Sequence, residues 1–279
     1  MRLKRRIFNT VYHTLMMAFS LLMIYPLVWL VMSSFKPTHD IMPTATKLIP
    51  EVFTLENYAN GWKGFARNTF GVFFKNSIII SVVSTVASVV GNSLRAFGFA
   101  RINFPGRKIW FAVMLSTMCL PGMVLNVPKY LMYNSWGWVG TYWPILLPGW
   151  FGGAFNTFLL MQFMRNIPKE MDEAAEIDGC GWWQLFTKIM LPMIKPAIAS
   201  VAIFAFMGAW NDYMSALLYL NKTERFPVAF ALKLFTDEFG TNYGPQMAMS
   251  VLSLIPIMIL FFIFQKQLVE GISTSGLKG

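Results

Sequence analysis

The loop between residues 165 and 196 carries the ionisable residues whose spacing is most informative in this sequence. Glu170, Asp172 and Glu173 follow Pro168, which suits the first turn of a helix because it has no N–H to leave unpaired. Negative charge in a first turn complements the helix dipole. The chemistry that this pattern predicts is docking rather than bond-making, since a rigid polar helix between two apolar segments needs a surface to rest on.

Gly179 and two prolines divide this loop into two short helices. Gly179 fits the left-handed position just beyond a helix end, and Asn166 fits the N-cap before the helix start. A second helix is expected over about 182–189, ending before Pro192, and Pro196 then opens the next apolar segment. The first helix is expected to present one shallow face with helical spacing, formed by Met171, Ala174, Ala175 and Asp178.

The residue sets that common enzymes use are missing from the sequence. It contains no Gly-x-x-x-x-Gly-Lys-Ser/Thr for phosphates, no His-Glu-x-x-His and no Gly-x-Ser-x-Gly. His13 and His39 are far apart, and Cys119 and Cys180 fall in an apolar segment and in the polar loop, so neither a metal site nor a disulfide is expected. We therefore expect a non-catalytic chain that binds no cofactor and takes its energy from a partner.

Composition indicates an integral membrane protein. Hydrophobic residues make up 56% of the 279 and charged residues 13%, whereas soluble domains carry about 25% charged residues. The net charge of +10 suits the basic cytoplasmic loops of membrane proteins. No basic stripe with interleaved aromatic residues is present, so we expect the chain to contact a lipid bilayer and no nucleic acid.

Six apolar stretches reach or approach the ~20 residues that a helix needs to cross a bilayer core. We therefore expect an all-α polytopic protein with one membrane domain over residues 1–279 and a polar loop over 165–196. The expected spans are Val11–Val31, Asn76–Leu94, Ile109–Pro128, Trp143–Met164, Ala197–Leu220 and Pro245–Gln265.

The distribution of lysine and arginine predicts the orientation of these spans. Four basic residues lie in 95–108 and one lies in 129–142, and the N-terminus carries Arg2, Lys4, Arg5 and Arg6. Because basic residues favour cytoplasmic loops, we expect both termini and the loop 165–196 on the cytoplasmic side of the cell (inner or plasma) membrane.

Asp212 is the only acidic residue within the expected spans, and Asn211 precedes it. An ionisable residue in a membrane helix usually faces the bundle interior or a wet cavity. Asn211 and Asp212 are therefore candidates for a translocation path. The alternatives are a structural hydrogen bond that fixes helix packing, or simple exposure near the outer interface.

The motif in the polar loop carries a family resemblance. Glu173-Ala174-Ala175, three residues, Gly179, nine residues, Ile189, one residue and Leu191-Pro192 resemble the signature of membrane subunits of binding-protein-dependent ABC importers. Cys180-Gly181 is a departure from the family pattern, in which a small residue and then a variable one usually follow the motif glycine. Further segments, in order, resemble the shorter six-span subunit of the maltose-type sugar importers: Pro26-Leu27-Val28-Trp29, Ser34-Phe35-Lys36, Ala100-Arg101, Phe104-Pro105-Gly106-Arg107, Trp210-Asn211-Asp212, Ile255-Pro256 and Gly276-Leu277-Lys278-Gly279.

The resemblance implies a type I ABC importer permease fold with a cytoplasmic coupling helix at about 168–178. That helix would sit in a cleft of a cytoplasmic ATPase dimer, with Glu173 facing a basic residue and ATP and Mg bound by the ATPase. The implied partners also include a second permease subunit, giving a heterodimer, and an extracellular sugar-binding protein. The coupling residues would be Glu173, Ala174, Ala175, Asp178, Gly179, Ile189, Leu191 and Pro192, and the tail Gly276, Leu277, Lys278 and Gly279 would touch the ATPase.

Other functions stay open at this point. An ion-coupled secondary transporter would need intramembrane charges, of which Asp212 is one, and commonly shows internal repeats. A membrane scaffold without transport would leave the polar loop resting on the headgroups, with Trp182 and Trp183 at the interface. The docking pattern of the loop favours the carbohydrate importer over both.

Overall fold

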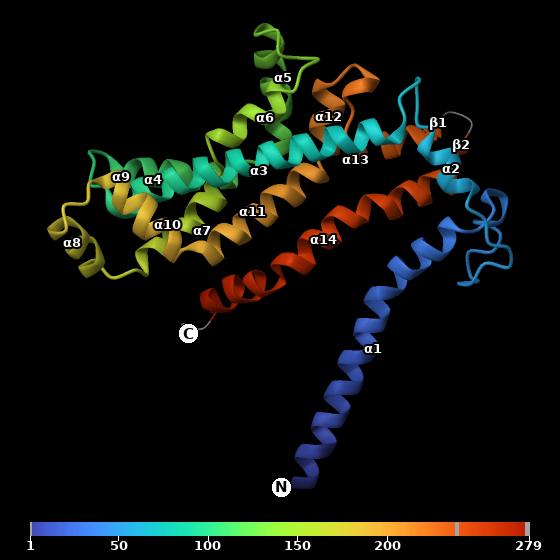
Figure 1. Cartoon of the computed structure of the whole chain (residues 1–279), viewed down its shortest axis with the longest axis horizontal. Coiled ribbons are helices and arrows are strands. Elements are labelled where there is room, and N and C mark those ends of the chain that lie inside the picture. Colours follow the sequence, from blue (N-terminus) through green and yellow to red (C-terminus); the bar gives the residue numbers. More distant parts are fainter. Residues whose placement is uncertain (1, 238–239, 277–279) are drawn as a thin grey trace. The chain divides into compact units, whose positions relative to one another are not determined.

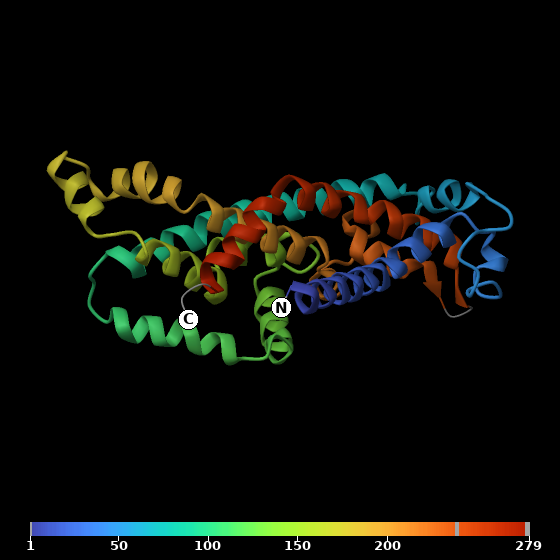
Figure 2. The same ribbon diagram turned by 90° about the horizontal axis from the view of Figure 1, so that it is seen from below.

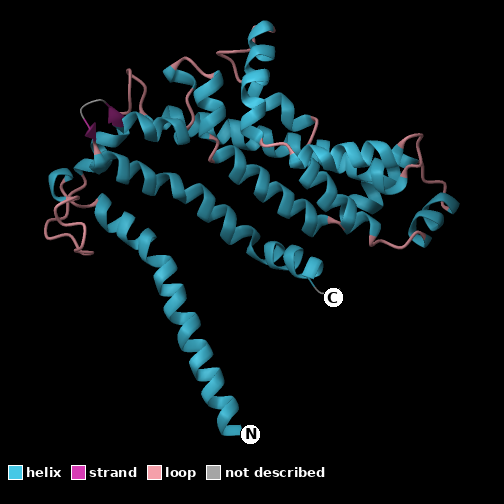
Figure 3. Ribbon diagram, turned by 180° about the vertical axis from the view of Figure 1, so that it is seen from behind, coloured by secondary structure: helices cyan, strands magenta, loops and turns pink. Residues whose placement is uncertain are grey.

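The structure is a computed structural model that describes residues 2–237 and 240–276, with side chains for 8–236 and 240–265. Helices dominate this part of the chain, and its one sheet pairs two-residue strands, β1 (Thr236–Asp237) and β2 (Gly240–Thr241) (Figure 3). The expected all-α class is confirmed. The chain forms two compact units, and the expectation of one membrane domain over 1–279 stays a prediction.

The first unit comprises Met1–Phe70 and Leu232–Ile255. Its helices begin with α1, which is exposed from Phe8 to Leu27 and apolar on all sides, as suits a helix in lipid or against another subunit. The elements of this unit are α1 (Arg2–Ser34), η1 (Thr38–Asp40), α2 (Glu56–Trp62), η6 (Leu232–Phe235) and the first turns of α14 (Tyr243–Gly276).

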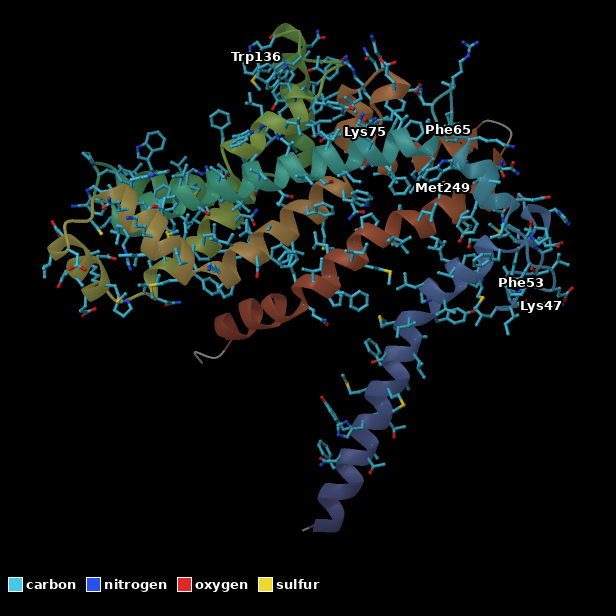
Figure 4. The ribbon with its side chains drawn as sticks, viewed as in Figure 1. Lys47, Phe53, Phe65, Lys75, Trp136 and Met249 are labelled. Carbon is cyan, nitrogen blue, oxygen red and sulfur yellow. The ribbon has the colours of Figure 1, made fainter. Side chains whose placement is uncertain are left out.

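Buried polar side chains hold the loop after α1 in place. Lys36 is 2% exposed, and its Nζ donates to the carbonyls of Thr44 (2.8 Å) and Lys47 (2.6 Å). Asn57, also 2% exposed, donates to the carbonyls of Ser34 and Lys36 and accepts from the Thr38 hydroxyl. The Ser-Phe-Lys segment noted in the sequence thus anchors this loop, which carries Lys47 and Phe53 (Figure 4).

The second unit comprises Gly71–Ala231 and Pro256–Gly279. In Figures 1 and 2, α3 and α11 run along this unit, and α8 lies at one end of it, away from α5 and α12. Its elements are α3 (Phe70–Arg101), α4 (Arg107–Ser116), η2 (Thr117–Cys119), η3 (Gly122–Leu125), α5 (Asn126–Ser135), α6 (Trp143–Trp150), α7 (Ala154–Arg165), α8 (Glu170–Ile177), α9 (Trp182–Gln184), η4 (Leu185–Met190), α10 (Leu191–Met193), α11 (Lys195–Trp210), α12 (Tyr213–Tyr219), η5 (Thr223–Arg225) and α13 (Val228–Ala231).

Four of the six expected spans are confirmed as stretches long and apolar enough to cross a membrane. They are Phe8–Ser34, Phe70–Arg101, Trp143–Arg165 and Tyr243–Gln265. The third of these contains a turn at residues 151–153, where α6 passes into α7. Buried Asn92 of α3 holds that turn, because its side-chain oxygen accepts from the Gly153 N–H and the Thr157 hydroxyl, each at 2.8 Å.

The third expected span, Ile109–Pro128, is broken by a bend. The helix axis turns by 99° between Arg107–Cys119 and Gly122–Ser135. Pro121 has no N–H for the helix ladder and disfavours helical geometry at the residue before it. Leu120 accordingly takes an extended conformation, with φ −80° and ψ 120°.

The fifth expected span, Ala197–Leu220, is also interrupted. α11 ends at Trp210 and α12 starts at Tyr213, with Asn211 and Asp212 between them. The Asp212 side chain accepts from the Ser215 N–H at 2.9 Å and so caps α12. A short acidic side chain that bonds to the backbone in this way competes with helix continuation.

Replacing Asn57 with alanine should destabilise the first unit. The change leaves two buried carbonyls and one hydroxyl without a partner, at about 1–3 kcal/mol for an unsatisfied buried group. The thermal unfolding midpoint of the purified protein should fall. Asn60→Ala, on the same helix but exposed, is the control and should leave the midpoint unchanged; equal effects would contradict the assigned role of Asn57.

Candidate docking helix and membrane cleft

The polar loop is built around α8, which lies between α7 and the helical stretch Trp182–Met193. The residue that precedes α8 as its N-cap is Lys169, not Asn166, which instead ends α7; no side-chain cap bond is made by either. The expected position of the helix is thus confirmed to within two residues, but the expected Asn166 cap is wrong. Pro168 accepts a bond from the Met171 N–H through its carbonyl, which fits its place before the first turn.

Gly179 ends α8 as expected. Its φ is +79°, a region that residues with a Cβ rarely adopt. The Gly179 N–H bonds to the Glu176 carbonyl and the Cys180 N–H to the Ala175 carbonyl, which together form a Schellman motif. A Cβ at Gly179 would meet nothing within 4 Å, so conformation rather than crowding selects glycine here.

The two sides of α8 differ in what they contact. Ala175 is 4% exposed and belongs to the core cluster of the second unit, together with Met164 and Leu185. Glu173, Ala174 and Asp178 are exposed, and Ile177 is 86% exposed. The predicted face of Met171, Ala174, Ala175 and Asp178 is therefore divided, because Ala175 alone faces the chain's own core.

An ion pair attaches α8 to the end of α3. Arg101 Nε lies 2.8 Å from Asp172 Oδ2, and the two side chains are 5% and 21% exposed. The Arg101 guanidinium also donates to the Ile167 carbonyl at 2.8 Å. Burial raises the pKa of Asp172, an effect that the charges of Arg101 and Lys169 oppose. Neither residue was among the predicted site residues.

The second half of the loop differs from the expected short helix. It does not end before Pro192 but continues to Met193, then turns by 81° into α11, whose second residue is Pro196. η4 is a stretch of π-helix that ends two residues before Pro192. Ile189 and Leu191 pack against the core cluster and Pro192 is exposed, so the first two hold the loop rather than offer a free surface.

A groove of about 270 Å³ runs beside α8. Because two acidic side chains, a tryptophan and a leucine share it, it offers mixed chemistry to a docking partner. It is lined by Asp172, Ala175, Glu176, Cys180, Gly181, Trp182 and Leu185. Of the predicted tail residues, Gly276 is the last residue of α14, and Leu277, Lys278 and Gly279 lie outside the described residues.

A second hollow, which we name the broken-helix cleft, lies where the two interrupted helices meet. It has a volume of about 470 Å³ and includes Asp212, whereas Asn211 is not among its lining residues and bonds back to the Met207 carbonyl. The structural alternative for Asp212, a hydrogen bond, is thus present as the α12 cap. The cleft is lined by Gly122, Met123, Asn126, Lys129, Tyr133, Pro144, Ile145, Pro148, Asp212, Met214, Ser215, Leu218 and Tyr219.

Sequence reasoning missed several residues of these two sites. Lys129 is the only basic residue between Lys108 and Arg165, which is the signal that could have singled it out. Arg101 and Asp172 lie far apart in the sequence, and no local pattern pairs them. Among the described residues, no group of three or more His, Cys, Asp or Glu could hold a metal ion.

The sequence is similar to those of known transport proteins. Residues 87–274 match the family described as "Binding-protein-dependent transport system inner membrane component". The diacetylchitobiose uptake system permease protein of Streptomyces coelicolor is 31% identical over 271 residues, covering 96% of this chain and 88% of the relative. An arabinooligosaccharides transport system permease protein of Halalkalibacterium halodurans is 31% identical and covers 92% and 91%.

The fold is also found among solved structures. A chain from the crystal structure of a bacterial ABC transporter involved in the import of the acidic polysaccharide alginate superposes with a TM-score of 0.80. The sequences are 24% identical, and the match covers 94% of this chain and 96% of that one. This likeness confirms the expected ABC importer permease fold.

Replacing Arg101 with methionine should detach α8 from α3. The change leaves Asp172 partly buried without its partner, which for fully buried pairs costs about 3–5 kcal/mol and should cost less here because the carboxylate is partly exposed. In a Cys119→Ser background, the remaining thiol of Cys180 should then react faster with a water-soluble maleimide.

Two further variants make this test specific. Arg165→Met removes a guanidinium from the neighbouring α7, where it lies over the Phe111 ring at 5.6 Å, and should leave the Cys180 rate unchanged. The exchanged pair Arg101→Asp with Asp172→Arg should restore part of the slow rate. A Cys180 rate that is the same in all variants would show that the ion pair does not hold α8.

Proposed function

This chain belongs to the family of binding-protein-dependent transport system inner membrane components, and we propose that it is a permease subunit of an ATP-driven carbohydrate importer. The match to that family over residues 87–274 carries the proposal. Its support for a carbohydrate, in particular an oligosaccharide, comes from relatives whose names specify diacetylchitobiose and arabinooligosaccharides. The chain is then a non-catalytic translocation subunit, and ATP and Mg are bound by a separate ATPase.

The docking helix α8 is the proposed contact with that ATPase. Support comes from its exposed side, where Glu173, Ala174 and Ile177 are open to solvent within the described part of this chain. These residues stand on a helix that is fixed at both ends. Glu173 and Asp178 offer negative charge to a basic residue, and Ile177 offers an apolar contact. The tail residues Gly276, Leu277, Lys278 and Gly279 are proposed as a second contact.

The remaining partners and the orientation complete the proposal. The chain pairs with a second permease subunit, and an extracellular binding protein delivers the carbohydrate. Both termini and α8 lie on the cytoplasmic side of the cell membrane, as the distribution of basic residues favours. Closure of the ATPase dimer then moves the docking helices as rigid bodies and switches the spans between inward- and outward-facing states.

Glu173→Lys should uncouple ATP hydrolysis from uptake. A lysine would place like charges against the basic residue expected on the ATPase, which costs several kcal/mol at a docking interface. Uptake of a labelled oligosaccharide into reconstituted vesicles should fall at least tenfold while the protein stays in the membrane. Glu56→Lys, the same change on exposed Glu56 of α2, is the control and should keep normal uptake; loss in both variants would argue against the assignment.

Two substitutions at Gly179 separate backbone strain from steric exclusion. Gly179→Ala and Gly179→Trp impose similar left-handed strain of about 1–2 kcal/mol, but the tryptophan also projects bulk into the space beside α8. Uptake should fall much further in the tryptophan variant. Equal uptake in the two variants would mean that nothing docks beside Gly179.

The energy source distinguishes this proposal from a secondary transporter. Uptake into vesicles should require internal ATP and should persist when a protonophore collapses the proton gradient. Uptake that stops with the protonophore but tolerates loss of ATP would favour an ion-coupled mechanism instead.

A further inference from the structure

We propose that the broken-helix cleft is a saccharide subsite, so that this chain itself contacts the transported sugar. The inference rests on the proposed carbohydrate transport and adds to it a place on this subunit and a set of binding groups. The cleft belongs wholly to the second unit, being formed by η3, α5, α6 and α12 with its cap Asp212.

The two helix breaks are the first reason. α11 rises about 24 Å over its 16 residues, short of the ~30 Å of a bilayer core, before it stops at Asn211. The stretch Arg107–Cys119 rises about 20 Å before its 99° turn. Irregular backbone at membrane depth is tolerated where protein buries it or where it lines a water-filled cavity. Gly122 and Asp212, from the two breaks, both line this cleft. Interrupted helices form the substrate sites of secondary transporters, and the same backbone chemistry is available here.

The aromatic wall is the second reason. Tyr133 and Tyr219 line the cleft with ring centroids 5.4 Å apart, edge to face. Tyr130 stacks on Tyr219, and Trp138 stacks on Tyr133 at 5.7 Å. Trp136, at the tip of α5, extends the cluster (Figure 4). Tyr133 and Tyr219 are only 7% and 4% exposed, so their rings form a rigid wall of the cleft. Apolar C–H groups of a pyranose or furanose ring would pack against the part of that wall that lines the cleft.

Free polar groups complete the match to a sugar. Asp212 uses Oδ1 to cap α12, and its Oδ2 has no hydrogen bond within the described chain. Lys129 and Asn126, one turn apart on α5, likewise have no side-chain partner among the residues described. One carboxylate, one amide and one ammonium thus offer both acceptors and donors to hydroxyl groups. Sites for small ligands are largely apolar with a few such polar groups.

A lipid acyl chain fits the cleft less well. Lys129 and Asp212 are costly to hold against hydrocarbon, whereas hydroxyls and water satisfy them. The same groups distinguish two kinds of sugar, because the Lys129 ammonium would pair with the carboxylate of an acidic saccharide. The subsite is therefore a saccharide site, and the response of Lys129 variants to neutral and acidic sugars shows which kind it prefers.

The first test measures access to the cleft in the complete transporter, reconstituted with its partner subunits. The background carries Cys119→Ser and Cys180→Ser, with Ser215→Cys inside the cleft or Ser135→Cys outside it as the matched control. A charged methanethiosulfonate should label Cys at 215. The saccharide probe should slow that labelling at least fivefold and leave position 135 unaffected.

The probe is chosen by transport. Labelled diacetylchitobiose, arabinotriose and trigalacturonate are tested for uptake by the wild-type transporter, and one that enters is used. Uptake of none of the three would contradict the proposed carbohydrate import itself.

When uptake is intact, two labelling results would contradict the subsite. Labelling at position 215 by N-ethylmaleimide but not by the charged reagent would mean that the cleft faces lipid. Labelling that the saccharide does not slow would mean that the cleft is an empty vestibule. Either result overturns the subsite and leaves the importer standing.

The second test uses variants that preserve the fold. Asp212→Asn keeps the α12 cap, since Asn and Asp cap equally well, but exchanges a carboxylate for an amide. Lys129→Gln removes the ammonium. Because a hydrogen bond to a charged group is worth roughly tenfold or more in binding, each should lower uptake at saturating binding protein about tenfold. Lys75→Gln, exposed on α3 outside the cleft (Figure 4), is the control and should not. Normal uptake in both cleft variants would overturn the inference.

Discussion

The need to satisfy backbone polar groups in an apolar surrounding is the constraint on which this structure depends. No water is available inside the bilayer core to bond to the backbone, so the N–H and C=O groups freed where a helix is interrupted need a partner within the protein. Asn92 supplies one at the turn between α6 and α7, and Asp212 supplies one at the start of α12. In both places a polar side chain of this chain bonds to a backbone N–H where a helix is interrupted.

Local partners for backbone and charged groups also hold the polar loop in place. The Schellman motif at Gly179 closes α8 without any side chain, and the Arg101–Asp172 pair fixes the helix to α3. Ala175, Ile189 and Leu191 fill the core beneath. What is left for a partner is the outer side with Glu173, Ala174 and Ile177. A family signature thus combines residues that hold the loop with residues that face outward.

Sequence reasoning reached the elements whose cause is local. Gly179 was predictable because one residue determines the conformation there, and four spans were predictable because length and apolarity suffice. The breaks in the third and fifth spans were not predictable from hydropathy. Hydropathy does not register the missing N–H of Pro121 or the capping bond of Asp212. The inward side of α8 was equally hidden, because Ala174 and Ala175 are chemically alike and contacts from other elements decide which is covered, namely the core cluster with Met164 and Leu185 and the ion pair to Arg101. The broken-helix cleft is lined by segments between residues 122 and 219, and no spacing in the sequence shows that they lie close together.

The attachment of α8 has a mechanical consequence. The helix is continuous in sequence with α7 and with the stretch that leads to α11, and its ion pair adds the end of α3 as a third anchor. A force applied to α8 is thus transmitted to α7, α11 and α3, whose ends next to α8 must move together. Beyond the turn at 151–153 and the break at Asn211, α6 and α12 are joined to α7 and α11 by short non-helical links. Because rigid helices near α8 carry further segments on non-helical links, a displacement of α8 would change the angle of those segments at the opposite end of the unit.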